Sequence, residues 1–278
     1  MRSTLASFAA LTLLALAAPL NAQNAPDDVV VNGQHLPRAA AEARARAYVR
    51  QVGIAAGVRQ ASRWIDPVCP KAIGLDAPLA DWVEARVRKV AAAAGAKLGK
   101  AGCRANFFVL FVADGAQTTR ALLDHVPDFV AELSRPRREG LLKGEAPIRW
   151  WYDSAARSRD GSPFDFFNSL GGVASLISAN TITVINHATV VIDAERATGA
   201  TLSAVADYAA LVGLAGLTPQ TPPPDDSILT LFEGDRRARE LSVWDRNFLS
   251  ALYRVPLARE ARQHRGILTQ RLTEAASE

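Results

Sequence analysis

The stretch SAVADYAALVGLAGL, residues 203–217, decides most of what the sequence indicates about the fold. Its small and apolar side chains fall on one helical stripe: Val205, Ala206, Ala209 and Val212. Two segments follow, DDSILTLF (225–232) and LSVWDRNFLSALY (241–253), and apolar residues spaced four apart in the second predict a helix with one buried face. We therefore expect a set of side chains to pack beneath a helix at 201–215: Leu229, Trp244, Leu249, Leu252 and Tyr253.

The composition indicates a globular protein with an ordinary core. The chain has 278 residues, 49% of them hydrophobic, and its formal net charge is +4. This is enough apolar material for a single domain over residues 37–278. Basic side chains cluster near 38–50 and in RPRRE (135–139). We interpret both clusters as solvated helix faces, and we expect no nucleic-acid partner.

Residues 1–22 have the order of charge and hydropathy of a secretory signal. Arg2 gives a short basic start, residues 5–18 form an apolar run, and Ala22 is a small residue before a cleavage point. That run is shorter than the roughly 20 residues of a membrane-spanning helix, which favours cleavage over a membrane anchor. We predict a periplasmic or secreted protein with a flexible leader at 23–36 and no transmembrane segment after cleavage.

Cys69 and Cys103 are the two cysteines of the chain. An oxidising compartment would let them pair, and we predict a disulfide that stabilises the fold by roughly 3 to 4 kcal/mol. Two buried free thiols are the alternative.

The remaining pattern predicts an α/β (α+β) fold. An extended segment at 63–75, an amphipathic helix over 77–98 and the apolar run ANFFVLFVADG (105–115) form a β-α-β unit whose second strand is buried on both faces. Helical segments are expected over 117–142, interrupted by prolines, and over 256–274. Further strands are expected at 148–154 and over 181–195, the latter as one bent strand or two paired ones.

A zinc hydrolase of the HExxHxxGxxH type places two histidines one helical turn apart, a glutamate that activates water, and a glycine before the third ligand. With Gly213 as the anchor, that spacing selects five positions: Ala206, Asp207, Ala210, Gly213 and Gly216. Only the glycine agrees. Both helical ligands are replaced by alanine, and Asp207 has a shorter side chain than glutamate.

ADYAALVGLAGL, then SIL, then LSVWDRNFLSALY is similar to the C-terminal half of matrixin-like zincins, and to uncharacterised exported bacterial proteins related to that fold. In those zincins a zinc-binding helix precedes a Ser-Val/Ile-Met turn and a final helix. Leu229 takes the place of the turn methionine, whereas Asp245, Leu252 and Tyr253 match. The resemblance implies a zincin-like mixed sheet and a pseudoenzyme without metal or cofactor.

The same resemblance implies a vestigial site. Ala206, Ala210 and Gly216 would surround a small groove with Asp207 at its edge, and a strand at 181–193 would form one wall with an exposed edge that accepts an extended peptide. An ordinary amphipathic helix with a small-residue face, packed flush against its neighbours, is the alternative.

Three other residues are candidates for facing a ligand. His187 lies within a predicted strand, and Trp150 and Trp151 are adjacent aromatic residues. No serine-nucleophile or nucleotide-binding motif occurs, so we predict no catalytic residue. The sequence favours a non-catalytic binding module, with a peptide or an envelope protein as partner. A peptidase-like hydrolase with an unrecognised active site is the alternative.

Overall fold

The computed structural model describes residues 36–125, 133–143, 145–163, 181–234 and 239–277. It divides into Met1–Gln34 and His35–Glu278, and all described residues belong to the second unit. The predicted signal at 1–22 and most of the leader at 23–36 lie outside the described residues.

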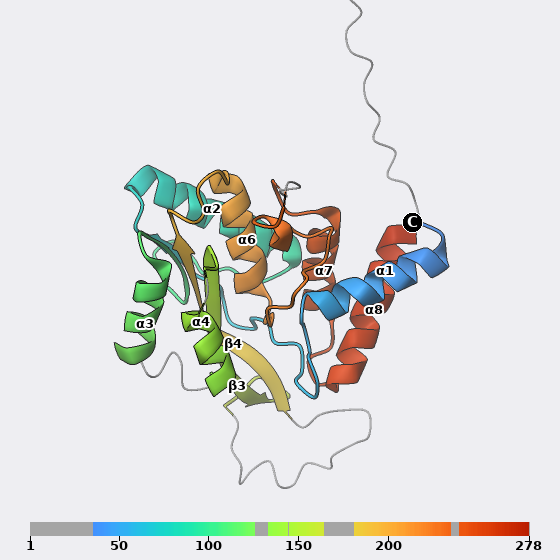
Figure 1. The fold of residues 1–278 in the computed structure, drawn as a ribbon. Helices are drawn as coiled ribbons and strands as arrows, with labels where there is room; N and C mark the ends of the chain where they lie inside the picture. Colours follow the sequence, from blue (N-terminus) through green and yellow to red (C-terminus); the bar gives the residue numbers. More distant parts are fainter. Residues whose placement is uncertain (1–35, 126–132, 144, 164–180, 235–238, 278) are drawn as a thin grey trace, which may run out of the picture. The chain divides into compact units, whose positions relative to one another are not determined.

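The described residues form one mixed sheet of four strands, shown in Figure 1. In sheet order these are β1 (Pro70–Ile73), β2 (Phe107–Val112), β4 (Thr181–Asp193) and β3 (Ile148–Ser158). The first three run parallel, and β3 is antiparallel to β4. This confirms the predicted α/β (α+β) class.

The β-α-β unit is confirmed. Helix α2 (Ala77–Ala94) connects β1 to β2, and it ends at Gly95, whose φ of 90° is the left-handed conformation that glycine adopts most easily. Cys69 and Cys103 stand before the two strands and form a disulfide, with their Cα atoms 6.0 Å apart. The disulfide therefore joins the chain just before the starts of two neighbouring strands.

Strand β4 is one continuous strand in the interior of the sheet. Residues Ala188 to Asp193 pair with β2 on one side, and the whole strand pairs with β3 on the other, with a register shift at Asp153 and Ser154. The expectation of an exposed edge at 181–193 was therefore wrong. The edge strand is β3, because the apolar residues at the end of β4 are buried between two neighbours.

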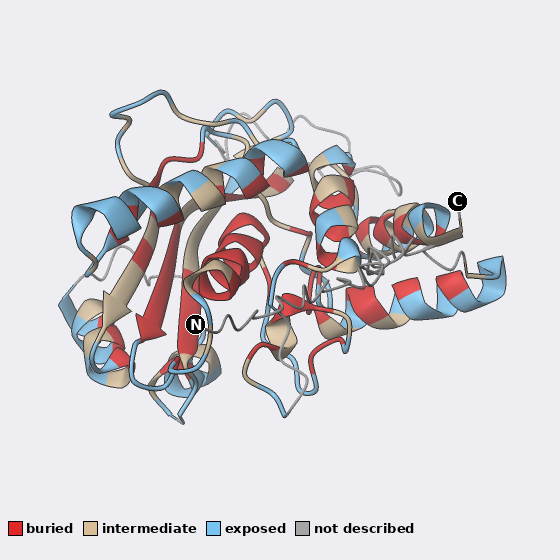
Figure 2. Cartoon of the chain, turned by 90° about the horizontal axis from the view of Figure 1, so that it is seen from above, coloured by how far each residue is buried: buried red, intermediate tan, exposed pale blue. Residues whose placement is uncertain are grey.

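Helices cover both faces of the sheet. Helices α3 (Gly115–His125) and α4 (Arg135–Leu142) bury one face through a cluster of Leu123, Leu141, Trp151 and Val191. Residues 126–132 between them, including Pro127, lie outside the described residues. On the other face α2 and α6 (Leu202–Leu214) belong to the main core. Every residue from Ala204 to Leu214 is buried, so α6 is red all round in Figure 2.

The C-terminal part packs against the first helix. The 3₁₀ turn η2 (Ile228–Thr230), α7 (Val243–Arg254) and α8 (Ala261–Ser277) follow α6. Helix α1 (Arg38–Gln51) begins after Pro37, and α8 runs antiparallel to it, since the amide of Leu36 donates to the carbonyl of Ala276 at 3.1 Å. Figure 1 shows the two helices crossing at the same end of the unit.

The packing predicted for α7 is correct in part. Leu249 and Leu252 are buried in the same core as α6, with Leu229 packed against that core, and the hydroxyl of Tyr253 donates to the carbonyl of Leu214 at 2.9 Å. Trp244 is half-buried against this core on the side of α1. It stacks on Tyr48 of α1, with ring centroids 5.8 Å apart.

Candidate functional site

Asp207 joins separate elements of the fold through hydrogen bonds to its carboxylate. Its carboxylate has no exposed surface, and it accepts hydrogen bonds from Arg86 at 2.6 and 2.8 Å and from the amide of Leu241 at 3.0 Å. The hydrogen bond to Asp207 raises the pKa of Arg86. A carboxylate satisfied in this way links α6 to α2 and to the segment before α7.

No groove opens at Ala206 and Ala210, because both residues have no exposed surface. A Cβ atom added at Gly213 would overlap the ring of Phe107, and one added at Gly216 would overlap the hydroxyl of Ser62. The small residues of α6 and of the segment after it thus allow close approach of a strand and a loop. Of the five positions selected by the zinc spacing, Gly216 lines the groove described below.

The structure separates the two tryptophans. Trp150 faces α6, where its ring meets Tyr208 edge-on at 6.0 Å and the guanidinium of Arg137 lies 5.5 Å from its centroid. Trp151 points to the opposite face and joins the cluster under α3 and α4. His187 lies on that second face beside Asp153, with Nδ1 3.0 Å from the carboxylate. The three candidates therefore do not form one site.

A groove of about 950 Å³ lies beside β3 and the start of β4, whose Thr181 and Thr183 also line it. Trp151, Tyr152 and Ser154 line it on the sheet side, and residues of the loop 53–62 line it opposite, together with residues of the segment 216–218. We call it the β3 groove. Its size is that of a ligand site, and its strand is the antiparallel edge of the sheet.

Main-chain groups on the outer edge of β3 point away from β4. The carbonyl of Trp150 accepts from Arg137 at 2.6 Å, and the amide of Ser158 donates to Ser162 at 2.9 Å, so both residues point away from β4. Peptide groups alternate in direction along a strand, which places those of Tyr152, Ser154 and Ala156 on the same outer edge. Within the described residues, Tyr152 and Ser154 have no strand partner on this edge, whereas the antiparallel bridge between Arg157 and Pro163 occupies the edge beside Ala156.

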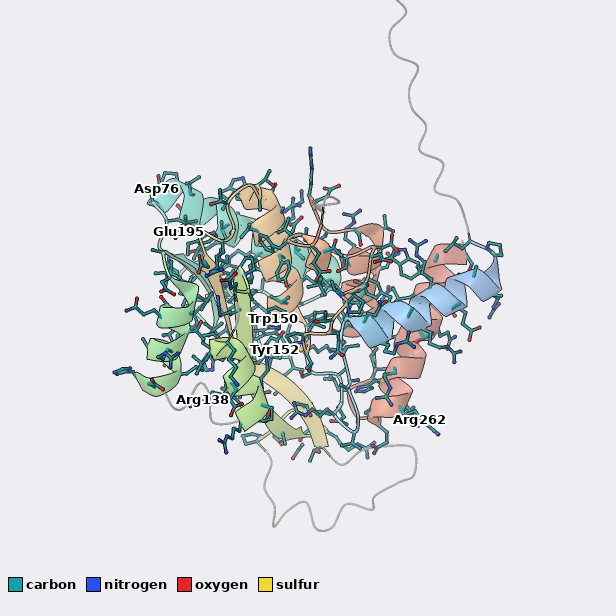
Figure 3. The ribbon with its side chains drawn as sticks, viewed as in Figure 1. Asp76, Arg138, Trp150, Tyr152, Glu195 and Arg262 are labelled. Atoms are coloured by element: carbon teal, nitrogen blue, oxygen red, sulfur yellow. A yellow bond between two sulfur atoms is a disulfide. The ribbon has the colours of Figure 1, made fainter. Side chains whose placement is uncertain are left out.

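The side chain of Tyr152 fixes the floor of the groove. Its hydroxyl lies within hydrogen-bonding distance of the carbonyls of Val212 and Ala215, at 2.5 and 2.8 Å, and accepts from the amide of Leu217 at 3.2 Å. Burial raises the pKa of Tyr152, so the phenol stays neutral at physiological pH. Trp150 and Tyr152 lie on the same side of β3 (Figure 3) and hold the end of α6 against the edge strand.

The opposite wall is a loop that hydrogen bonds hold in place and that exposes one apolar side chain. Gln60 donates to the carbonyls of Thr181 and Arg259 at 3.1 and 2.9 Å, and the amide of Ala61 donates to His264 at 2.9 Å. Val58, in the same loop, is 94% exposed. Val58 could not be found from the sequence, because a single valine between Gly57 and Arg59 has no periodicity. Tyr152 stood in a predicted strand, but its partners could not be foreseen.

The described residues contain no group of three or more His, Cys, Asp or Glu side chains placed to hold a metal ion. None of the described helices is both long and apolar enough to cross a membrane. No protein-family model, curated protein or solved structure matches the chain.

Proposed function

We propose that this protein is a non-catalytic binding module for an extended peptide, which adds as a strand to the outer edge of β3. The observation that carries the proposal is the pair of outward peptide groups at Tyr152 and Ser154, two residues that also line a groove of about 950 Å³. Main-chain hydrogen bonds to such an edge supply affinity, and side-chain pockets supply selectivity. These two residues would engage a segment of about four residues.

The groove favours an apolar side chain in the peptide. Val58 exposes almost its whole surface on the wall opposite β3, and Leu133 lines the same groove. Contact with a bound apolar side chain would remove the exposed valine from water. Two arginines, Arg59 and Arg137, line the groove with one glutamate, Glu260, so only weak selection for peptide charge is expected.

The proposal includes a zincin-like pseudoenzyme that is exported to the periplasm or secreted, with a peptide segment of an envelope protein as partner. The order of α6, η2 and α7 supports the zincin-like interpretation, with the peptide on β3 in place of 181–193. The disulfide supports export, because disulfides persist in oxidising compartments.

Binding of a defined peptide tests the proposal. The probe is the hexapeptide Thr-Val-Thr-Val-Thr-Val, acetylated and amidated, and its affinity is measured by calorimetry. Ser154→Pro removes the outward amide but leaves the β4 ladder intact, because proline is tolerated on an outer edge. Loss of that hydrogen bond should weaken binding by about tenfold. Ser154→Ala keeps the amide and is the matched control.

A second pair of probes tests the main-chain geometry. In two versions of the peptide, alternate amides are N-methylated, so one version loses every N–H group that would donate to β3 and the other keeps them. Binding of one version and not the other is expected. Equal affinities for both versions, or an unchanged affinity of Ser154→Pro, would refute the proposal.

The same mixtures of protein and peptide also test whether the protein is a binding module or a hydrolase. Mass spectrometry of the peptide after incubation should show intact peptide. Cleavage that tracks the protein through purification would favour the alternative, a peptidase-like hydrolase with an unrecognised site.

A further inference from the structure

A second groove lies between α1 and α8. It has a volume of about 740 Å³ and shares Gly53 and Ala56 with the β3 groove, so the loop after α1 forms a wall of both. We call it the α1–α8 groove. Its charged lining is unequal: two glutamates, Glu42 and Glu274, stand against five arginines, which are Arg38, Arg46, Arg50, Arg262 and Arg265.

The antiparallel arrangement gathers four of the arginines at one end. The start of α1 meets the end of α8 through Leu36 and Ala276, so the last turns of α1 lie beside the first turns of α8. Arg265 confirms this, since it donates to the carbonyl of Gly57 at 3.0 Å. Arg46 and Arg50 therefore face the end of the groove formed by Arg262 and Arg265. The sequence could not show this, because the two helices are separated by some two hundred residues.

The arginines of the groove differ in their ion-pair and hydrogen-bond partners. Arg46 pairs with Glu42 on the same helix, and Arg265 is held by main-chain carbonyls of Ala55 and Gly57. Within the described part of the chain, Arg50 and Arg262 have neither an ion pair nor a hydrogen bond to another side chain. Figure 3 shows Arg262 at the start of α8. Like charges gathered without a counterion repel, and a bound anion would remove that repulsion.

The space beside Gly266 in this groove is not filled by other side chains. Gly266 lies within α8, although glycine is a poor helix former, and a Cβ atom added there would meet nothing within 4 Å. Packing therefore does not require glycine at this position. Thr269 lines the groove one turn further along and presents a hydroxyl group.

We infer that the α1–α8 groove binds a phosphate-bearing ligand at its arginine-rich end. Arg50 and Arg262 would donate to the phosphate oxygens, and Arg265, already oriented by two carbonyls, would add a third guanidinium. The planar guanidinium matches phosphate geometry with two parallel hydrogen bonds. This inference does not depend on the proposed peptide function, because the two sites use different side chains.

Calorimetry with inorganic pyrophosphate tests the inference. The double variant Arg50→Gln/Arg262→Gln should bind pyrophosphate at least about tenfold more weakly than the wild type. The matched control is Arg104→Gln/Arg254→Gln, which removes the same charge from exposed positions outside the groove and should stay within about twofold. Gly266→Leu fills the groove without changing the charge and should also weaken binding. Ser154→Pro should leave it unchanged, which separates this test from the peptide test.

Co-sedimentation with vesicles of phosphatidylglycerol and phosphatidylcholine identifies the source of the phosphate. If the wild type binds both pyrophosphate and the vesicles, and the double variant binds neither, the ligand is a lipid headgroup. Pyrophosphate binding alone assigns a soluble phosphate compound, and both outcomes support the inference. Absence of saturable pyrophosphate binding, or an equal loss in the control pair, would overturn it.

Discussion

The hydroxyl of Tyr48 donates a hydrogen bond to the carboxylate of Asp245 at 2.6 Å, across 197 positions of sequence. Asp245 has no exposed surface, and it also accepts from the hydroxyl of Ser227 at 2.6 Å and from the amides of Ile228 and Ser242 at 2.8 and 2.9 Å. Burial, and then the nearby carboxylate, raise the pKa of Tyr48. One carboxylate thus ties α1, η2 and α7 together.

Asp245→Ala should be severely destabilising. The substitution leaves the buried donors of Tyr48, Ser227, Ile228 and Ser242 without their acceptor, and we expect a loss of more than about 3 kcal/mol in the free energy of unfolding. Urea denaturation at neutral pH measures the loss. Asp225→Ala, at an exposed position, should change the free energy by less than about 0.5 kcal/mol. Similar values for both variants would contradict the structural role of Asp245.

The disulfide should make a stabilising contribution that depends on redox state. Cys69→Ser/Cys103→Ser should lower the free energy of unfolding by about 3 to 4 kcal/mol, because the unfolded chain gains the entropy of an open loop. Reductant should destabilise the wild type and leave the double variant unaffected. Mass analysis without reductant that found two free thiols would rule out the pairing.

The parts of the fold that follow local rules could be predicted. The apolar run around Phe107, which ends in a turn signal, favours a strand, and its place after an amphipathic helix indicates the β-α-β unit with the disulfide at the starts of its two strands. Ser242 and Asp245 form a capping box that starts α7, so the beginning of that helix is also a local matter.

The sheet order and the candidate site could not be predicted, because both depend on distant partners. Nothing between 148 and 193 says that β4 inserts between β2 and β3, which is why the exposed edge was assigned to the wrong strand. Small residues on α6 fit both a lost metal site and close packing. The buried ring of Phe107 against Gly213 shows what the small face contacts here.

Two helical glycines should respond to alanine with opposite signs. Gly213→Ala places a methyl group in the ring of Phe107, and overpacking of this kind costs about 1 to 3 kcal/mol. Gly266→Ala meets open space, so it should gain roughly 0.5 to 1 kcal/mol from helix propensity. Urea denaturation of the two variants measures both changes. Stabilisation by Gly213→Ala would mean that α6 lies further from β2 than described.

Stability should fall in mild acid through His264. Its Nδ1 accepts from the amide of Ala61 at 2.9 Å, and its Nε2 lies 3.0 Å from the carbonyl of Pro256, so the neutral ring with a proton on Nε2 satisfies both partners. If Nδ1 were protonated as well, its N–H group would point at the N–H group of Ala61, and the hydrogen bond between them would be lost. Burial lowers the pKa of His264, with Arg63 adding to the effect and Glu260 opposing it.

The lowered pKa of His264 determines how the stability of the protein changes with pH. The unfolded chain takes up the proton more readily than the folded protein, so the contribution of His264 is complete above its unfolded pKa of about 6.5 and is lost as the pH falls below it. Melting temperatures between pH 7.5 and 5.5 measure the loss, taken over about two pH units around that value. His264→Gln can offer one acceptor and one donor without titrating, and it should flatten the profile in this window. A wild-type profile as flat as that of His264→Gln would show that the ring is not confined to its neutral form, and that the loop carrying Gln60 and Ser62 is not held through it.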